Sequence, residues 1–380
     1  MTLEQAYQKA WPGLRHKMEQ SVALIQKAER LAKMYDPENG FYLAFSGGKD
    51  SQALYHITQL AGVAFKAHFS PTSVDPPQVI RFIKKQYPDV EFEKVDKSMY
   101  QVAKEMGMVP TMKLRWCCAK FKESAGEGKV TLTGVRHSES VKRSKRKSVE
   151  VTGHKFAGDI NEFFAWSAEK VAKKMKNINQ DEISRDKEQE VRCINGKDSI
   201  IVNPLVEWTD ADVWDFLNKV VEVPHCELYD PPYNRRRIGC ILCPMSSHAT
   251  KMRDLELYPY VKKKWLEVFE YFIGGGYTPT YAKLKKSSSS ANTGGGGIQT
   301  SQPRQVQGNG STTTPPLRMY AERASELCPP PDGRTRNGKP RWGEAGVSLS
   351  AEVLFNWWLT HKSWEEFKAD LEHPSLFDEE

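Results

Sequence analysis

Apolar and polar residues alternate along the first 135 positions in segments that predict strands followed by helices. Two segments, 52–60 and 79–87, place their apolar residues on one helical face. Because strands that alternate with helices form parallel sheets, we expect an α/β fold with a doubly wound parallel sheet, whose ligands bind at the carboxyl ends of the strands. The predicted strands are short apolar runs, and they span 41–45, 63–69, 90–95 and 129–135.

The segments outside this pattern predict a helical extension, a linker and a short terminal unit. Residues 1–37 carry helical spacing and should form N-terminal helices. The sheet domain is expected to span 38–275, with the charged stretch 155–192 as an insertion or lid. Residues 287–316, rich in Ser and Gly, are typical of a disordered, flexible linker. Beyond the linker, 317–380 should form a small helical segment.

The aromatic residues of this last segment leave two interpretations open. The run 353–359 includes the adjacent Trp357 and Trp358 and predicts a helix. The helix either docks on the core or meets a partner. If it is separate from the core, truncation at about residue 286 should leave the fold and the chemistry intact.

Composition narrows the class of protein only slightly. The chain has 55 Lys and Arg against 48 Asp and Glu, a net charge of +7, which is compatible with an anionic nucleotide or a nucleic acid. No run approaches the roughly 18 apolar residues of a membrane span. The N-terminus is polar and lacks the apolar core of a secretion signal, so the expected location is cytoplasmic. There, the seven cysteines should be thiols or ligands and not disulfides.

The segment Ser-Gly-Gly-Lys-Asp-Ser at 46–51 carries the strongest chemical signal. It follows the first predicted strand and opens the next helix. Two glycines let the backbone approach an anion, at which the first N–H groups and the helix dipole point. Lys49 adds a charge, expected to be solvated, and Ser46 and Ser51 add hydroxyl donors. The Walker A spacing is not met, so this is not an ordinary kinase or GTPase loop.

This segment resembles the PP-loop of the ATP pyrophosphatase (adenine nucleotide alpha-hydrolase) superfamily. The resemblance implies that ATP with Mg²⁺ binds here and that pyrophosphate leaves as the α-phosphate is attacked, with Lys49, Asp50 and Arg136 as catalytic residues. Arg136 lies in a Gly-x-Arg segment similar to a family element and would meet a phosphate or sulfate oxygen in a fork. The expected nucleotide-binding residues are Ser46, Gly47, Gly48, Lys49, Asp50, Ser51, Phe69, Ser70, Gly134, Arg136 and Arg143.

Four of the cysteines occur as two pairs. Cys117 and Cys118 are adjacent, whereas Cys240 and Cys243 form a C-x-x-C pair. A C-x-x-C pair alone is compatible with zinc, a redox dithiol, a cluster or no metal. Adjacent cysteines suit zinc poorly, because their side chains diverge. A [4Fe–4S] cluster takes its thiolates at separate irons and tolerates that divergence better.

The same pairs resemble the cluster-binding pattern of assimilatory adenylylsulfate reductases. The surrounding sequence, including Trp208-Thr209 and Tyr229-Asp230, is similar to the phosphoadenylylsulfate reductase family over about 38–247, and Thr209 is expected to cap a helix over 210–218. The resemblance implies a [4Fe–4S] cluster, with zinc or no metal as alternatives. Its ligands would be Cys117, Cys118, Cys240 and Cys243.

Three departures weigh against a reductase. Sulfonucleotide reductases lack the loop lysine that this chain keeps at Lys49, and their acidic-Thr-Gly turn is replaced here by 72–77. Their nucleophilic cysteine lies in a C-terminal Glu-Cys-Gly-Leu-His segment, whereas Cys328 precedes three prolines. The loop resembles that of the ATP-cleaving members instead, which include the small subunit of sulfate adenylyltransferase and the DNA phosphorothioation sulfurtransferase DndC.

We therefore expect a DndC-like, ATP-dependent adenylating enzyme with a [4Fe–4S] cluster that acts in sulfur transfer or sulfur metabolism. One alternative is a thiol-dependent reductase of adenylylsulfate or phosphoadenylylsulfate, using Cys193, Cys226, Cys328 or a thiol of another protein. A second alternative is a non-catalytic nucleotide-binding or nucleic-acid-binding module. The implied partners are an adenine nucleotide, a sulfur donor such as a cysteine desulfurase or a thioredoxin-like donor, and a nucleic-acid substrate.

Overall fold

The computed structural model describes most of the chain outside two long stretches. The predicted linker and Cys328 lie outside the described residues, as does nearly all of the predicted insertion. The chain forms two compact units, the first from residues 1–95 and 121–240 and the second from 96–120 and 241–380. The described residues are 1–122, 126, 128–141, 143–152, 191–194, 199–274, 350–360, 362–363, 366–367 and 369.

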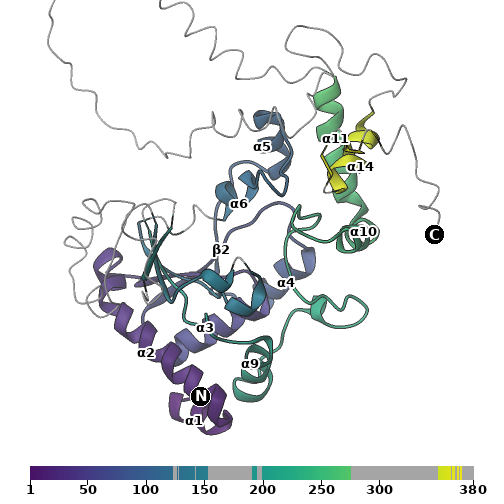
Figure 1. Cartoon of the computed structure of the whole chain (residues 1–380). Coiled ribbons are helices and arrows are strands. Elements are labelled where there is room, and N and C mark those ends of the chain that lie inside the picture. Colours follow the sequence, from purple (N-terminus) through teal and green to yellow (C-terminus); the bar gives the residue numbers. More distant parts are fainter. Residues whose placement is uncertain are drawn as a thin grey trace, which may run out of the picture. The chain divides into compact units, whose positions relative to one another are not determined.

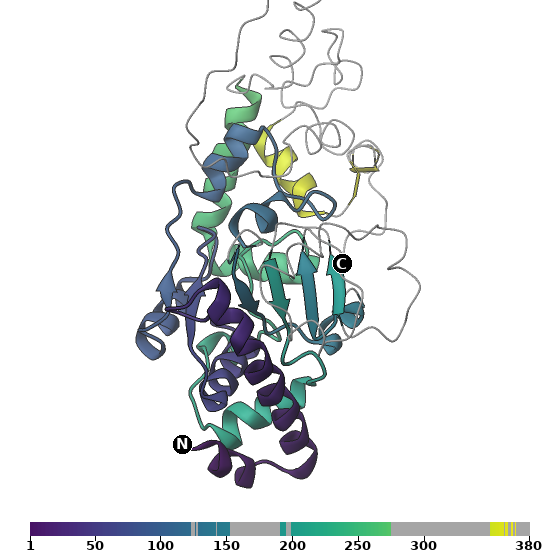
Figure 2. The same cartoon turned by 90° about the vertical axis from the view of Figure 1, so that its left-hand side faces the viewer.

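A seven-stranded sheet, in the order β3-β2-β1-β4-β7-β5-β6, is the centre of the first unit (Figure 2). Its first five strands in this order run parallel, whereas β5 pairs antiparallel with β7 and parallel with β6. The strands are β1 (Phe41–Ala44), β2 (Phe65–Phe69), β3 (Glu91–Phe92), β4 (Val130–Leu132), β5 (Val149–Thr152), β6 (Val191–Ile194) and β7 (Ser199–Val202).

The predicted α/β class and the four predicted strands are confirmed, but the sheet is mixed and not wholly parallel. The unpredicted β5 has the short pattern Val-Glu-Val-Thr, which lacks a continuous apolar run. Its Glu150 is fully buried and forms an ion pair with Arg146. A hydropathy pattern assigns such a residue to the surface, because it does not register a charge that is neutralised in the core.

Helices cover the apolar residues of this sheet. Helix α2 packs along α3, and both lie beside the strands (Figures 1 and 2). The helical spacing predicted within residues 1–37 corresponds to the buried face of α2, which extends from Leu14 to Ala32. Thr209 caps α9 as predicted, by accepting a hydrogen bond from the backbone N–H of Asp212. The helices of the first unit are α1 (Leu3–Lys9), α2 (Pro12–Tyr35), α3 (Lys49–Ala61), α4 (Pro77–Gln86) and α9 (Asp210–Asp215).

Strand register brings the predicted site segments to one edge of the sheet. Leu43 of β1 pairs with Ala67 of β2 and with Leu132 of β4, so the three strands end at the same level. The residues that follow them include Ser46, Ser70 and Gly134. This edge is the carboxyl end, where ligands of parallel sheets bind.

The second unit consists of helices. Helix α14 packs along α11, and α5 also contacts α11 (Figures 1 and 2). The Trp358 indole N–H donates to the Pro110 carbonyl at 2.7 Å, and Lys251 Nζ donates to the Leu359 carbonyl at 2.9 Å. The C-terminal helix is therefore docked within its own unit. The helices are α5 (Met99–Met106), α6 (Trp116–Phe121), α10 (His248–Leu257), α11 (Pro259–Ile273) and α14 (Ala351–Leu359).

None of the helices in the described part of the chain combines the length and the apolar character that a membrane crossing requires.

Candidate functional site

The loop between β1 and α3 is held in a tight conformation by its glycines. Gly47 adopts a φ of +71°, and a Cβ at this position would lie 2.9 Å from Cγ1 of Val79 on α4. Only glycine satisfies both constraints. The Ser51 hydroxyl closes the loop, because it accepts a hydrogen bond from the Ser46 N–H at 3.1 Å and donates to the Gly48 carbonyl at 2.8 Å.

A third glycine brings β4 against the first turn of α3. A Cβ at Gly134 would lie 2.8 Å from the backbone oxygen of Asp50. This close approach places Arg136, two residues further on, beside the loop. The predicted Gly-x-Arg segment therefore has two roles. Gly134 allows close contact with the first turn of α3, and Arg136 places its guanidinium beside the loop.

Two cations and two carboxylates form the centre of the site. Lys49 and Arg136 are only 2% and 1% exposed. Arg136 Nε lies 2.8 Å from Asp50 Oδ1, and its Nη2 bonds to Asp210. Lys49 Nζ lies 3.5 Å from Asp50 Oδ2 and 3.4 Å from Asp210 Oδ1. We call Lys49, Asp50, Arg136 and Asp210 the four-charge centre.

The charges of this centre shift one another's proton affinity. Burial would lower the pKa of Arg136, but the Asp50 and Asp210 carboxylates outweigh it and raise that pKa. Burial would raise the pKa of Asp210, but Arg136 and Lys49 outweigh it and hold that pKa below its usual value. Arg136 and Asp210 are therefore both charged at neutral pH.

The Arg136 guanidinium is also oriented by uncharged acceptors. Its Nη1 donates to Ser138 Oγ at 2.8 Å and to the Trp208 carbonyl at 3.2 Å. The Trp208 indole N–H in turn donates to Ser21 Oγ on α2 at 3.0 Å. A guanidinium fixed on several sides presents its charge to a ligand without a further loss of side-chain entropy.

Two residues of the site were not among those predicted. Asp210 was predicted only as the start of a helix, and the structure shows that it links both cations. The Tyr229 hydroxyl accepts a hydrogen bond from the Lys49 backbone N–H at 2.8 Å. Both residues lie more than 150 positions beyond the loop in sequence. Thr209 as an N-cap predicted the helix but not what its first residue contacts, and Tyr229 belonged to the family resemblance without a predicted role.

Arg143 lies outside the four-charge centre. It pairs with Glu139, and Arg237 lies 2.6 Å from the same carboxylate. Burial would raise the pKa of Glu139, but the two guanidiniums outweigh it and hold that pKa below its usual value. Glu139 also accepts a hydrogen bond from the Arg136 N–H at 3.1 Å. Arg143 thus supports the segment that carries Arg136.

Phe69 ends β2 and Ser70 follows it, but neither residue joins these ion pairs. The Phe69 side chain is 3% exposed and packs in the core, with its ring centroid 5.1 Å from that of Phe92. Burial raises the pKa of Tyr42, and the Ser70 side chain partly counteracts this effect. Their role in nucleotide binding stays a prediction.

The four paired cysteines are divided between the two units. In the first, Cys240 Sγ lies 3.5 Å from Thr72 Oγ1 and 3.3 Å from Lys122 Nζ. In the second, the Arg115 guanidinium donates to Cys118 Sγ at 3.2 Å. Among the residues that the structure describes, no three His, Cys, Asp or Glu side chains are grouped so as to hold a metal ion. The metal assignment therefore stays a prediction from the sequence.

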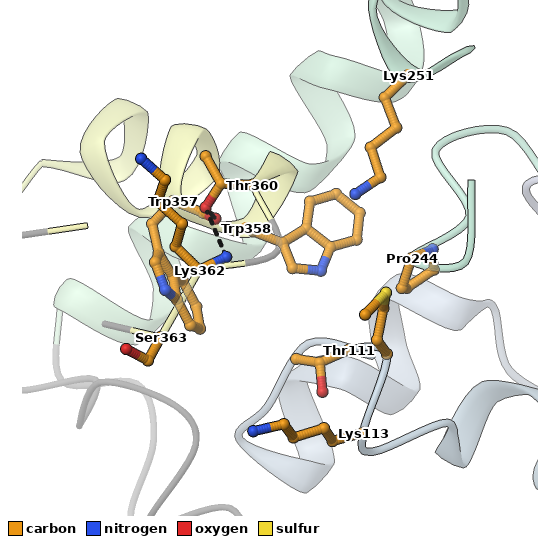
Figure 3. Close-up of a pocket in the computed structure, with 10 residues that line it drawn as sticks. Thr111, Lys113, Pro244, Lys251, Trp357, Trp358, Thr360, Lys362 and Ser363 are labelled. Carbon is orange, nitrogen blue, oxygen red and sulfur yellow. Dashed lines mark hydrogen bonds between the residues drawn. The ribbon is translucent and has the colours of Figure 1, made fainter. Parts of the chain in front are cut away.

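A cavity of about 80 Å³ lies in the second unit, lined in part by Trp357, Trp358, Lys113 and Lys251. In Figure 3, Lys251 reaches towards Trp358 from one side, whereas Lys113 extends away on the other. Burial lowers the pKa of Lys251 to about 8. The ammonium groups of Lys113 and Lys251 do not converge on a common point in this cavity.

A glycine loop that opens a helix, with buried cations at the carboxyl edge of an α/β sheet, is typical of proteins that bind anionic ligands such as nucleotides. Residues 40–246 match the family model of the phosphoadenosine phosphosulfate reductase domain. This match covers more than half of the 380 residues, and the chain therefore belongs to this family, as the sequence motifs predicted. The predicted membership of the adenine nucleotide alpha-hydrolase superfamily is also confirmed.

Individual proteins are more distantly similar. The chain is 25% identical over 264 residues to an uncharacterized protein of Methanocaldococcus jannaschii, covering 66% of this chain and 52% of the relative. It thus spans about half the length of that relative. Among solved structures, FMN adenylyltransferase of Candida glabrata is 17% identical, with a TM-score of 0.34, and 63% of this chain and 70% of that chain are covered. Phosphoadenylyl-sulfate reductase of Candida auris, as a phosphate complex, is 18% identical, with a TM-score of 0.33 and coverages of 61% and 95%.

Proposed function

We propose that this protein is an ATP-dependent adenylating enzyme that cleaves ATP between its α- and β-phosphates. The observation that carries the proposal is the four-charge centre at the N-terminus of α3, with Lys49 and Arg136 buried and preassembled. A nucleophilic oxygen forms a bond to the α-phosphorus. The bond from that phosphorus to the bridging oxygen breaks, and pyrophosphate leaves with the electron pair.

The four-charge centre supplies what this reaction needs. Negative charge grows on the leaving pyrophosphate, and most of catalysis in phosphoryl transfer is positioning and charge stabilisation. In the free protein, Asp50 and Asp210 balance Lys49 and Arg136, which keeps two buried cations in place without a ligand. Phosphate oxygens can accept hydrogen bonds from the same Lys49 and Arg136 donors, because guanidinium and ammonium groups bind both carboxylate and phosphate.

The two carboxylates also fit a magnesium ion that accompanies ATP. Mg²⁺ prefers oxygen ligands and is usually held by one or two carboxylates together with substrate phosphates. Asp50 is the proposed ligand of the magnesium ion. Asp210, which pairs with Lys49 and Arg136 as Asp50 does, offers a second carboxylate. When bound, the ion neutralises charge on the phosphates.

We further propose that the adenylated group is used in sulfur transfer or sulfur metabolism. This part rests on the family and on the four paired cysteines, for which a [4Fe–4S] cluster is the proposed occupant and zinc the alternative. Among the described residues, these cysteines do not form a grouped ligand set. The same proposal includes an acceptor for the adenylyl group, a sulfur donor or thioredoxin-like donor, and a nucleic-acid substrate.

The position of Cys226 argues against this thiol as the nucleophile of a thiol-dependent reductase. Cys226 is fully buried, and burial raises the pKa of its thiol. A buried thiol of raised pKa is a poor nucleophile at neutral pH. The presence of Lys49 in the loop also favours a substrate that still carries its pyrophosphate, such as ATP, over an adenylylated compound such as adenylylsulfate.

The product of ATP cleavage tests the main proposal. Full-length protein, Mg²⁺ and [α-³²P]ATP are incubated with candidate acceptors such as sulfate, tRNA and DNA, and the products are separated by chromatography. We expect labelled AMP, or a labelled adenylyl adduct, together with pyrophosphate. Release of ADP and orthophosphate would contradict the proposal and indicate a kinase-like mechanism.

The cluster is tested separately from ATP cleavage. Protein purified without oxygen should be brown and contain about four irons per chain, from the four-thiolate stoichiometry. Replacing Cys117 or Cys240 by serine should remove the colour, because each supplies one ligand. Cys226→Ala is the matched control and should keep the colour. A colourless protein with one tightly bound zinc ion would favour a structural zinc site instead.

A further inference from the structure

Tyr229 is held rigidly beside the nucleotide loop by aromatic packing. It ends the 3₁₀ turn η5 (Glu227–Tyr229), and its ring meets that of Trp214 on α9 edge to face, with centroids 5.0 Å apart. The His225 ring lies 6.1 Å away in a similar orientation. Aromatic pairs in this geometry attract each other, so the phenol is fixed before a ligand arrives.

The Tyr229 hydroxyl occupies a position normally taken by a helix-capping side chain. Gly48 is the N-cap residue of α3 and has no side chain to cap it. The Lys49 N–H, one of the free donors at this helix end, bonds to the Tyr229 oxygen at 2.8 Å. A Cβ at Gly48 would lie 3.3 Å from that oxygen, so the glycine also makes room for the phenol.

The phenol keeps its own proton available for a ligand. Burial raises the pKa of Tyr229 and outweighs the Lys49 N–H, which lowers it, while the Asp50 carboxylate raises it further. The hydroxyl is therefore neutral at physiological pH and can donate one hydrogen bond. In the part of the chain that the structure describes, the hydrogen-bond partner of this hydroxyl is a donor, the Lys49 N–H, and no acceptor bonds to its proton.

We infer that Tyr229 is a phosphate-binding residue of this site and donates its hydroxyl proton in a hydrogen bond to the pyrophosphate portion of the nucleotide. The inference rests on the proposed function. The Lys49 N–H polarises the phenol by donating to its oxygen, which strengthens the hydrogen bond that the phenol donates. Tyr229 thereby adds one hydrogen-bond donor at the N-terminus of α3, beside the Lys49 ammonium and the Arg136 guanidinium.

Binding of inorganic pyrophosphate to the full-length protein, measured by isothermal titration calorimetry, tests this inference. Tyr229→Phe keeps the ring on Trp214 and removes only the hydroxyl. We expect its pyrophosphate affinity to fall about tenfold, as for a lost hydrogen bond to a charged group. Tyr55→Phe is the matched control, because Tyr55 is a buried tyrosine of α3 itself and its hydroxyl donates to Asp89 at 2.5 Å. The control should bind pyrophosphate as the wild type does.

AMP is the second probe, because it lacks the leaving pyrophosphate. Tyr229→Phe should bind AMP within about twofold of wild type, whereas damage to the fold of the loop would weaken both ligands. Equal loss for both ligands, or no loss for pyrophosphate, would overturn the inference. Tighter pyrophosphate binding would overturn it as well, since the phenol would then be blocking the Lys49 N–H.

Lys49→Ala separates this inference from the proposed function. One outcome is that the wild type binds pyrophosphate, Lys49→Ala does not, and Tyr229→Phe binds it as tightly as the wild type. In that case the inference on Tyr229 fails, whereas the proposed function stands. If the wild type itself binds no pyrophosphate, the proposed function fails and the inference fails with it.

Discussion

Replacing Lys49 by alanine should reduce the rate of ATP cleavage by about 10²–10³-fold. The ammonium is one of two buried cations at the helix end, and loss of a single preorganised donor to developing charge typically lowers kcat about 10²–10³-fold. Pyrophosphate release from labelled ATP, measured with the same acceptor for wild type and variant, gives the ratio.

The Lys49 side chain also has a structural role that the sequence did not predict. The sequence suggested a solvated lysine whose removal leaves the fold intact, whereas the structure buries it between Asp50 and Asp210. We expect Lys49→Ala to lower the free energy of unfolding by about 1–3 kcal/mol, the range for lost bonds between charged groups. Asp210 is 42% exposed and keeps Arg136 as a partner, so the protein should still fold.

Lys17→Ala is the control for this prediction. Lys17 pairs with Asp212 at 2.6 Å, in the same turn of α9 that supplies Asp210, but is not part of the loop. Its variant should cleave ATP at close to the wild-type rate. If Lys49→Ala, shown to be folded by circular dichroism, also retained the wild-type rate, the assignment of the loop would be wrong.

The sequence predicted those parts of the site that lie close together along the chain. Gly47, Gly48 and Lys49 follow a buried strand and open a helix, and this local pattern was enough to predict an anion-binding loop. Gly134 and Arg136 could be added because parallel strands end at one edge of a sheet. In each case a short-range rule and the α/β topology led to the same position.

The parts that could not be predicted depend on long-range packing. Asp210 and Tyr229 reach the loop only because α9 and η5 are folded back onto α3, and neither residue type is unusual in its own segment. Likewise, Glu150 is buried because Arg146 and Asn203 satisfy it, and a hydropathy pattern cannot register this partnership. The mixed part of the sheet was missed for the same reason.

Truncation at residue 286 should destabilise the second unit, contrary to the expectation from the sequence. The truncation removes α14, whose Leu354, Phe355, Trp357, Trp358 and Leu359 are all buried. Burial of a side chain of this size contributes roughly 1.5–3 kcal/mol, and the truncation also exposes the face of α11 that these side chains cover, so the second unit should lose stability. Hydrogen exchange of the α11 amides, which α14 covers, should speed up accordingly.

A deletion of 287–316 alone is the control, because it retains α14 and removes none of the described residues. Its α11 amides should exchange as slowly as those of the intact chain. Trp358→Ala tests the same contact by a point change. The indole donates to the Pro110 carbonyl and lies 4.7 Å from the Trp265 ring, and a buried tryptophan replaced by alanine typically costs 3–5 kcal/mol. If both the truncation and Trp358→Ala left α11 exchange unchanged, α14 would contribute nothing to the second unit, and its buried aromatic face would instead have to be explained by a partner.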